Sequence, residues 1–441
     1  MSLEGKSLKK DFFKFIIPSV VSQWVFALYT MVDAMFVARG VSETALAAVN
    51  ISSPFVSGMF ATSLTFAVGT STIIAMLFGQ KNVQRAKEVF SQNIMVLSVL
   101  AILFTIFAMC NLEAVCTFLG ATEHTMPYVK EYIGTLAPFA ICFILSYTFE
   151  ILISTDGYPQ LATIIVMVGV VLNCILDYLL VMVFHKGVWG AAFATGISQA
   201  AVILLYLVHF LGKKGSIKFC KFKFHPGQIL HEAKNGFPSG ITELSAGVIT
   251  FVFNQAIIRC LNEDALVSYS VIAYLNSIFV MTMIGVAQGC QPLISYYYGK
   301  KEPQKCKKLL KYEVIMVFVT SIGAFAFCCL ISKVFVHAFI SKELVELSAY
   351  TVKVLKIFIL SFLVVGYNIV IAGFFTAIEK TIPAIIIALG RGFITLVISV
   401  VAVVSLFGGE SIWYASVVSE LLCLGVAIAL YIGIYGRKKR K

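Results

Sequence analysis

The sequence predicts an all-α integral membrane protein in which twelve transmembrane helices form two pseudo-symmetric six-helix bundles around a central cleft. Three observations lead to this fold class. The 441 residues are 59% hydrophobic and only 13% charged, whereas a soluble domain averages about 45–50% apolar and about 25% charged residues. Twelve apolar segments are each long enough to cross a bilayer as a helix. The last six segments also repeat residues of the first six at a nearly constant offset.

The twelve apolar segments follow one another with short polar connections. Several exceed the roughly 20 residues that span the hydrocarbon layer, so we expect tilted helices and bends at internal prolines such as Pro18 and Pro138. The first segment is too long for the core of a signal peptide, so we expect it to remain as a span. The expected helices are 12–38, 50–78, 91–112, 128–153, 160–184, 188–212, 237–260, 266–298, 312–337, 347–377, 382–407 and 410–436.

Lysine and arginine residues are concentrated on alternate connections. If the N-terminus is cytoplasmic, twenty-five of them lie on the cytoplasmic face and eight on the opposite face. Loops rich in lysine and arginine stay on the cytoplasmic side, so we expect a multi-pass protein of the cell membrane with both termini in the cytoplasm. Because the basic residues orient the helices in this way, the net charge of +12 does not indicate nucleic-acid binding.

An internal repeat divides the chain. Pro18 and Pro238 open the first and seventh segments 220 residues apart, and farther along Pro159 and Pro383 are 224 residues apart. Because six crossings return the chain to its starting side, the two halves have the same orientation and form a parallel repeat, as in alternating-access carriers. The predicted parts are an N-terminal six-helix bundle (1–212), a basic cytoplasmic linker (213–235), and a C-terminal six-helix bundle with a basic cytoplasmic tail (236–441).

Acidic residues within apolar segments break this symmetry. A charged aspartate inside a membrane costs roughly 2.5–3.5 kcal/mol on insertion scales. Asp33 lies in the first segment, and Asp177 lies one helical turn after Asn173 on the same helix face. The repeat places Phe253 opposite Asp33 and Val401 opposite Asp177. An expensive group kept in only one half indicates a function in that half.

Three further acids are candidates. Glu150, in the fourth segment, is a candidate for binding substrate or a proton, although a wet vestibule would also accommodate it. Glu243 and Glu420, in the second half, have uncertain roles, because Arg391 in the eleventh segment is a potential ion-pair partner that would make them structural.

The sequence favours neither a metal site nor an enzyme. Its six histidines are scattered, and a metal site needs several ligands at suitable spacing. Most of its eleven cysteines lie in apolar runs without CxxC spacing, which does not indicate a disulfide framework. Motifs of nucleotide-binding loops, zinc proteases and serine hydrolases do not occur.

Two stretches carry a family resemblance that extends over almost the whole chain. Residues 32–39, Val-Asp-Ala-Met-Phe-Val-Ala-Arg, are followed by Ala-Leu-Ala-Ala-Val at 45–49. Residues 172–177, Leu-Asn-Cys-Ile-Leu-Asp, are followed by Gly-Val-Trp-Gly-Ala-Ala-Phe-Ala-Thr at 187–195. These stretches resemble the multidrug and toxic compound extrusion (MATE) family, and the second is the more specific. The chain departs from many relatives at 154–158, where Ser-Thr-Asp-Gly-Tyr replaces Arg-Ala-x-Gly.

The resemblance implies a cation site in the first bundle. Relatives with such a site use an aspartate on helix one, an asparagine and an aspartate one turn apart on helix five, and a threonine on helix six. Asp33, Asn173, Asp177 and Thr195 fall on these positions. Glu150 resembles the helix-four acid of the bacterial drug-exporting branch. Since helix ten lacks a mid-span acid, the resemblance implies no cation site in the second bundle.

The implied function is multidrug efflux by antiport. Amphipathic, often cationic organic compounds would leave in exchange for H⁺ or Na⁺, without a cofactor, through a two-state carrier that works as a monomer in membrane lipid. Helix one would bend or repack at Pro18. Aromatic and methionine side chains suit varied apolar cations, and the candidates to line the cleft are Tyr29, Phe55, Met59, Phe143 and Tyr147.

A flippase for lipid-linked oligosaccharides, from a related fold group, is the nearest alternative. It would need a basic cleft to hold pyrophosphate, whereas the acids expected in this cleft suit cationic cargo. A channel, a membrane enzyme or a receptor is a more distant alternative, and transport driven by a proton or sodium gradient would discriminate among them.

Overall fold

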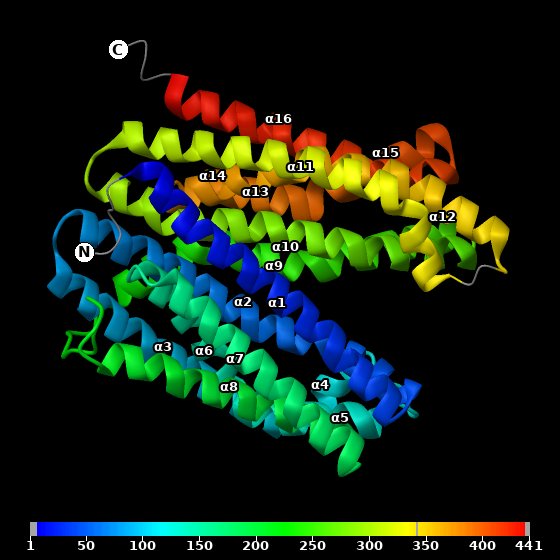
Figure 1. Cartoon of the computed structure of the whole chain (residues 1–441), viewed down its shortest axis with the longest axis horizontal. Helices are drawn as coiled ribbons and strands as arrows, with labels where there is room; N and C mark the ends of the chain where they lie inside the picture. Colours follow the sequence, from blue (N-terminus) through cyan, green and yellow to red (C-terminus); the bar gives the residue numbers. More distant parts are fainter. Residues whose placement is uncertain (1–6, 341–342, 437–441) are drawn as a thin grey trace.

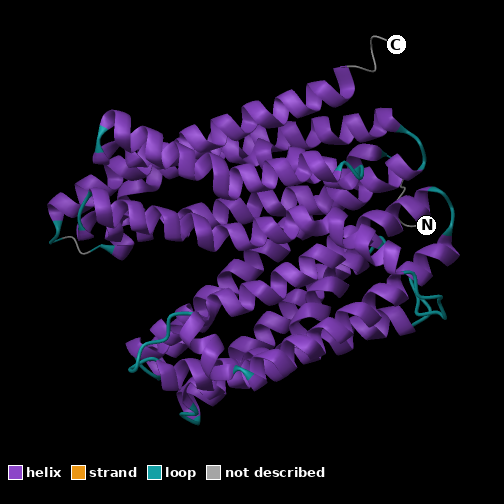
Figure 2. Cartoon of the chain, turned by 180° about the vertical axis from the view of Figure 1, so that it is seen from behind, coloured by secondary structure: helices purple, strands orange, loops and turns teal. Residues whose placement is uncertain are grey.

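The computed structural model describes residues 7–340 and 343–436, and within them almost all of the chain is helical (Figure 2). In this described part, twelve helical stretches are long and apolar enough to cross a membrane. The predicted all-α membrane fold is confirmed. Residues 1–6 and the predicted basic tail from Arg437 lie outside the described residues.

The first half contains ten helical elements, and its fourth span is assembled from α5, η1 and α6. Proline has no N–H to donate, and Pro138 accordingly lies in the short 3₁₀ turn that joins α5 to α6. The elements are α1 (Leu8–Gly40), α2 (Glu43–Gly79), α3 (Val83–Cys110), α4 (Leu112–Phe118), α5 (Met126–Leu136), η1 (Ala137–Phe139), α6 (Ala140–Thr155), α7 (Pro159–Asp177), η2 (Tyr178–Val183) and α8 (Gly187–Leu211).

The second half has a similar order of elements, and a π-helical turn occurs in each half, η2 in the first and η4 in the second. Its elements are α9 (Pro226–Cys260), α10 (Glu263–Gly299), α11 (Pro303–Phe339), α12 (Val345–Phe358), η3 (Ile359–Ser361), α13 (Phe362–Ala377), α14 (Thr381–Leu389), η4 (Gly390–Ile394), α15 (Thr395–Phe407), η5 (Gly409–Tyr414) and α16 (Ala415–Gly436).

The repeat extends to capping and backbone conformation. Helices α2 and α10 each have 37 residues, and their bounds are offset by 220 positions. The Ser42 and Asn262 side chains accept hydrogen bonds from backbone N–H groups three residues later, at 3.1 and 2.9 Å. After these helices, Lys81 and Lys301 both adopt positive φ, 62° and 60°. Equivalent sequences therefore fold in the same way in both halves.

The two halves meet at one end and separate toward the other. In Figure 1, α3–α8 lie on one side and α11–α16 on the other, with α1, α2, α9 and α10 between them. Helix α2 packs against α9, and α1 packs against α10. The start of α1 and the end of α16 lie at the end where the halves converge (Figure 1).

Glycine residues allow the closest helix contacts between the halves. A Cβ on Gly236 of α9 would overlap the carbonyl oxygen of Thr65 of α2, and a Cβ on Gly69 of α2 would overlap that of Glu232 of α9. Small residues permit such backbone approach between membrane helices. The converging end therefore depends on residues that have no side chain.

The irregular connection between the halves is shorter than the linker predicted at 213–235, because α9 already begins at Pro226. Asp156 of the first half anchors this connection. Its carboxylate accepts hydrogen bonds from the backbone N–H groups of Ser216 and Ile217, at 2.8 and 3.1 Å, and its other oxygen lies 2.9 Å from Nε2 of His209. Thus a residue within the stretch that departs from the family pattern ties the connection to the first half.

Gly236→Ala should destabilise the protein, since the added methyl group would force α9 away from α2. Overpacking of this kind typically costs about 1–3 kcal/mol, which thermal unfolding of the purified protein in detergent would detect. Gly247→Ala on the same helix is the matched control, because nothing lies within 4 Å of a Cβ at that position. An equal effect of both substitutions would contradict the close-approach argument.

Candidate functional site

The four residues predicted as cation ligands come together in the first half. Asp33 lies on α1, Asn173 and Asp177 on α7, and Thr195 on α8, and all four are buried. The Asp33 and Asp177 carboxyl groups are near neighbours. Asn173 Nδ2 donates to Thr195 Oγ1 at 3.3 Å, and the Tyr29 hydroxyl lies near the Thr195 side chain.

The local structure explains this convergence. Helices α7 and α8 pack together, and α1 packs on α7. The regular α-helix ends at Asp177, where the π-helical turn η2 begins. Such turns often occur at functional sites. A Cβ on Gly40 of α1 would overlap Val181 of η2, so this glycine lets the end of α1 approach the turn.

The site has more hydrogen-bond acceptors than donors. Among the described residues, no donor reaches Asp33 Oδ1, Asn173 Oδ1 or either carboxylate oxygen of Asp177. Buried polar atoms are normally hydrogen-bonded, and two adjacent carboxylates repel each other when both are ionised. A proton or a cation between the carboxyl groups would satisfy both requirements.

The ligand types indicate which cations suit the site. Carboxylate, amide and hydroxyl oxygens are hard ligands that prefer hard cations. No group of three or more histidine, cysteine, aspartate or glutamate side chains with metal-binding spacing occurs in residues 7–340 and 343–436. The cluster therefore fits a proton or an alkali cation better than a transition metal.

One cavity connects this cluster with Glu150, and a second cavity also reaches Glu150. The first, of about 510 Å³ including open space, is lined by Tyr29, Asn173, Thr195 and Glu150. The second, of about 540 Å³, is lined by Glu150 and by Ser22 of α1, and the Glu150 carboxyl group lies near the Ser22 side chain. Helix α1 thus contacts both predicted acidic positions, through Ser22 and through its own Asp33.

A polar chain joins Glu150 to the proline of α1. Ser22 Oγ donates to Thr163 Oγ1 at 3.0 Å, and Thr163 Oγ1 lies 2.8 Å from the carbonyl oxygen of Pro18. Helix α1 is continuous through Pro18. The hydroxyl of α7 therefore supports α1 at the position predicted to be its hinge.

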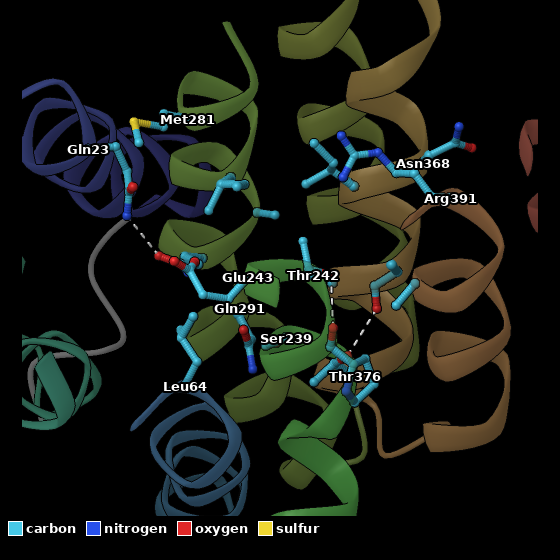
Figure 3. Close-up of a pocket in the computed structure, with 18 of the residues that line it drawn as sticks. Gln23, Leu64, Ser239, Thr242, Glu243, Met281, Gln291, Asn368, Thr376 and Arg391 are labelled. Atoms are coloured by element: carbon cyan, nitrogen blue, oxygen red, sulfur yellow. Dashed lines mark hydrogen bonds between the residues drawn. The ribbon is translucent and has the colours of Figure 1, made fainter. Parts of the chain in front are cut away.

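A larger cavity of about 960 Å³, including the space open to solvent, lies between the halves (Figure 3). The amide of Gln23 on α1 donates to Gln288 of α10 across it, at 3.2 Å. Phe26, Phe60 and Tyr147 line both this central cavity and the cavity beside Thr195. The two spaces are therefore separated by shared aromatic side chains.

The predicted cleft-lining residues have mixed outcomes. Tyr147 lines the central cavity, as expected, whereas Tyr29 lines the cavity beside Thr195 and not the central one. The assignment of Phe55, Met59 and Phe143 to the cleft is wrong, since all three are buried in the hydrophobic core and line none of these cavities. The Phe55 ring packs 5.0 Å from that of Phe104 on α3, because this face of α2 points into its own bundle.

Several residues of the central cavity escaped sequence reasoning. Phe26 and Phe60 were indistinguishable from other aromatic residues of the spans. Gln23, Gln288 and Gln291 offered a usable signal, because an amide inside an apolar segment needs a polar partner. All five line the central cavity.

The second-half acids have different surroundings. Glu243 lines the central cavity (Figure 3). Glu420 forms the ion pair foreseen with Arg391, at 3.0 Å, and also accepts a hydrogen bond from Asn368 Nδ2, at 2.7 Å. The carboxylate of Glu420 is therefore engaged, whereas that of Glu243 faces the cavity.

Two further buried acids, Glu232 and Glu313, were not predicted as functional. Glu232 fell in the stretch assigned to the linker. It accepts hydrogen bonds from Thr70 at 2.9 Å and Asn93 at 3.2 Å, and so fastens α9 to the first half where the halves converge. Glu313 of α11 lies beside Cys290 of α10.

Asp177→Asn should stabilise the protein in the absence of coupling cations, because it replaces one of two adjacent acids by an amide that donates a hydrogen bond. We expect the midpoint of thermal unfolding at pH 8, without Na⁺, to rise by about 2 °C or more. Asp156→Asn is the matched control. Since the Asp156 carboxylate is supplied with donors, this change should destabilise by about 1–3 kcal/mol. An unfolding midpoint of Asp177→Asn below that of the wild-type protein would contradict the inference that the site has more hydrogen-bond acceptors than donors.

Comparisons with known proteins agree with this geometry. The multidrug export protein MepA of Staphylococcus saprophyticus is 28% identical over 98% of this chain and 94% of its own length. MepA of Staphylococcus haemolyticus is 24% identical over 98% of this chain and 95% of its own length. A solved structure of a multidrug resistance MATE family transporter, described as outward-facing, has a TM-score of 0.93 at 20% identity and covers 100% of this chain and 98% of its own.

The family profile itself matches in two copies, one in each half of the chain. The MatE profile covers residues 18–179 and 238–401. These ranges contain the predicted cation ligands of α1 and α7 and the opening prolines of both halves. The chain therefore belongs to the MatE family, the multidrug and toxic compound extrusion transporters.

Proposed function

We propose that this protein is a secondary active multidrug exporter that exchanges amphipathic, often cationic organic compounds for H⁺ or Na⁺. The observation that carries the proposal is the buried pair of Asp33 and Asp177, which lies next to a cavity and lacks hydrogen-bond donors. Relatives similar over almost their whole length are named multidrug export proteins, which supports the same function.

In this proposal the coupling ion binds at the aspartate pair. Asp33 and Asp177 compensate its charge, while Asn173 Oδ1 and Thr195 Oγ1 supply neutral oxygens. Coupling requires that the ion and the drug favour different states of one two-state element. Helix α1 is suited to be this element, because it carries Asp33, lines the central cavity with Gln23 and Phe26, and contains a proline that lacks one helical hydrogen bond.

The proposed orientation follows from the basic residues. With both termini in the cytoplasm, the end where the halves converge is cytoplasmic and the separated end faces outward. The described conformation then corresponds to a carrier closed toward the cytoplasm, where Glu232 and the glycine contacts hold α2 against α9. We infer a monomer in the cell membrane, since one chain contains both halves and the cavity between them.

A lipid-linked oligosaccharide flippase remains the second candidate. The cargo of such a flippase carries a pyrophosphate group, so the central cavity would need a net positive charge to hold it. Arg391 lines this cavity, but Glu420 pairs with it, and Glu243 contributes a negative charge. The charges therefore favour export of cationic amphiphiles.

Dye efflux from vesicles that contain the purified protein tests the proposal. An imposed proton or sodium gradient should drive export, and Asp177→Asn should reduce it at least about tenfold, because the site loses one of its two acids. Glu131→Gln, which removes an exposed acid of α5, should leave export unchanged. Gradient-driven export that survives in Asp177→Asn would refute the proposed coupling site.

Thr195→Val separates the two coupling ions. The substitution keeps the shape of the side chain but removes a neutral oxygen. If Na⁺ is the coupling ion, we expect the Na⁺ concentration for half-maximal transport to rise about tenfold. This rise corresponds to the loss of roughly 1.4 kcal/mol of Na⁺-binding free energy. Proton-driven transport should change less than twofold. Thr195→Ser keeps the hydroxyl and serves as the control in both experiments.

A further inference from the structure

The guanidinium group of Arg391 lies inside the membrane-spanning part of the second half. It belongs to the π-helical turn η4, in the middle of the eleventh span, and its side chain is 10% exposed. Ionisable side chains at such depth are expensive, and they usually face a cavity or a partner and have a function. Arg391 has both a partner and a cavity.

One edge of the guanidinium is fixed by protein contacts. Nε donates to Glu420 Oε1 at 3.0 Å, and the other carboxylate oxygen of Glu420 accepts a hydrogen bond from Asn368. A Cβ on Gly392 would overlap Ser245 Oγ, so the turn fits closely against α9. These contacts hold the Arg391 side chain in one orientation without using its terminal nitrogens.

The other edge of the guanidinium is available to a ligand. Arg391 lines the central cavity. In the described residues, no acceptor is hydrogen-bonded to its Nη1 or Nη2 group. Both nitrogens remain accessible, since neither is among the fully buried atoms that lack a partner. Figure 3 shows the Arg391 side chain among those that line this cavity. Two parallel N–H donors are the geometry that binds a carboxylate in bidentate fashion.

An acid without an ion pair contributes to the same cavity. Glu243 extends from α9 on another part of the wall (Figure 3). No hydrogen bond or ion pair to its carboxylate occurs within residues 7–340 and 343–436, and its oxygens are accessible. Phe26, Phe60 and Tyr147 supply flat apolar surface to this cavity. One cavity thus offers an anion-binding edge, an acid and aromatic faces.

We propose that the Nη edge of Arg391 is an anion subsite of the central cavity and that the transporter recognises zwitterionic amphiphiles. Arg391 binds the carboxylate of such a compound, Glu243 attracts its cationic group, and the aromatic side chains contact its apolar body. This inference rests on the proposed export function and specifies its substrate class. Purely cationic compounds use only Glu243 and the aromatic faces.

A pair of matched dyes tests the subsite directly. A rhodamine free acid is a zwitterion, whereas its ethyl ester carries only the cationic ring system. Binding of each dye to the purified full-length protein in lipid nanodiscs is measured by fluorescence polarisation. We expect Arg391→Gln to weaken binding of the free acid by about tenfold or more, the effect of losing hydrogen bonds to a charged group. Binding of the ester should change less than twofold, and Arg391→Lys should retain part of the preference for the free acid.

Arg391→Gln also leaves Glu420 without its ion-pair partner, so a second variant isolates the subsite. In the double variant, Arg391→Gln together with Glu420→Gln, the two amides can still hydrogen-bond to each other, and position 420 no longer carries an unpaired acid. The free acid should stay weakly bound if Arg391 is the subsite. Restored binding in the double variant, or equal weakening of both dyes in Arg391→Gln, would overturn the proposal. Arg259→Gln, which removes an exposed charge at the end of α9, is the matched control.

Efflux of the same dyes from vesicles distinguishes failure of the subsite from failure of the export function. If the wild-type protein binds the free acid through Arg391 but exports neither dye, the proposed export function is wrong and the subsite stands. If it exports both dyes and Arg391→Gln exports them with unchanged relative efficiency, the subsite is wrong and the export function stands.

Discussion

The contact between two acids in an apolar bundle is the constraint on which the rest of this structure depends. Asp33 and Asp177 are buried on different helices, and three of their four carboxylate oxygens receive no hydrogen bond within residues 7–340 and 343–436. In a medium of low dielectric, two such groups are stable together only when a proton or cation reduces their repulsion. The free energy of placing α1 against α7 is therefore linked to occupation of the site. Because α1 also lines the central cavity, a change at the acids can alter the space available to a substrate.

The two halves share a scaffold but use it differently. At the repeat offset, Ser419 takes the place of Thr195, so a hydroxyl is kept, but Phe253 replaces Asp33. The Phe253 ring is fully buried and stacks on Tyr269 at 5.1 Å. Aromatic packing thus fills the place that Asp33 occupies in the first half. The second half instead has Arg391, a cation paired with Glu420. The first half therefore holds two adjacent acids, whereas the second half holds an arginine paired with an acid.

The converging end balances stability against movement. Glycines bring the backbones of α2 and α9 into direct contact, and the buried Glu232 links them through Thr70 and Asn93. These contacts join the halves through closely approaching backbones and buried polar groups. The interior of each half is instead filled by aromatic and aliphatic side chains, which would be costly to separate. Separation of the halves at this end is therefore expected to leave each half intact.

The sequence by itself determined the spans, the repeat and three residues of the acid cluster, Asp33, Asn173 and Asp177, whereas Thr195 followed only from the family resemblance. Acids and amides are conspicuous in an apolar chain because their burial is expensive, and the i, i+4 spacing of Asn173 and Asp177 defines a shared face before any folding is known. The exact linker bounds of 213 and 235 were less predictable, since α9 begins at Pro226, eleven residues before the expected start of this helix at 237.

Only the tertiary structure decided which apolar side chains face the central cavity. Phe55 and Met59 point into the core of the first half, whereas Phe60 lines the cavity. In a helix that is hydrophobic all round, periodicity does not identify the inward face, and packing against neighbouring helices sets its rotation. The same reason applies to Arg391, whose pairing with Glu420 instead of Glu243 depends on how α9, η4 and α16 pack together.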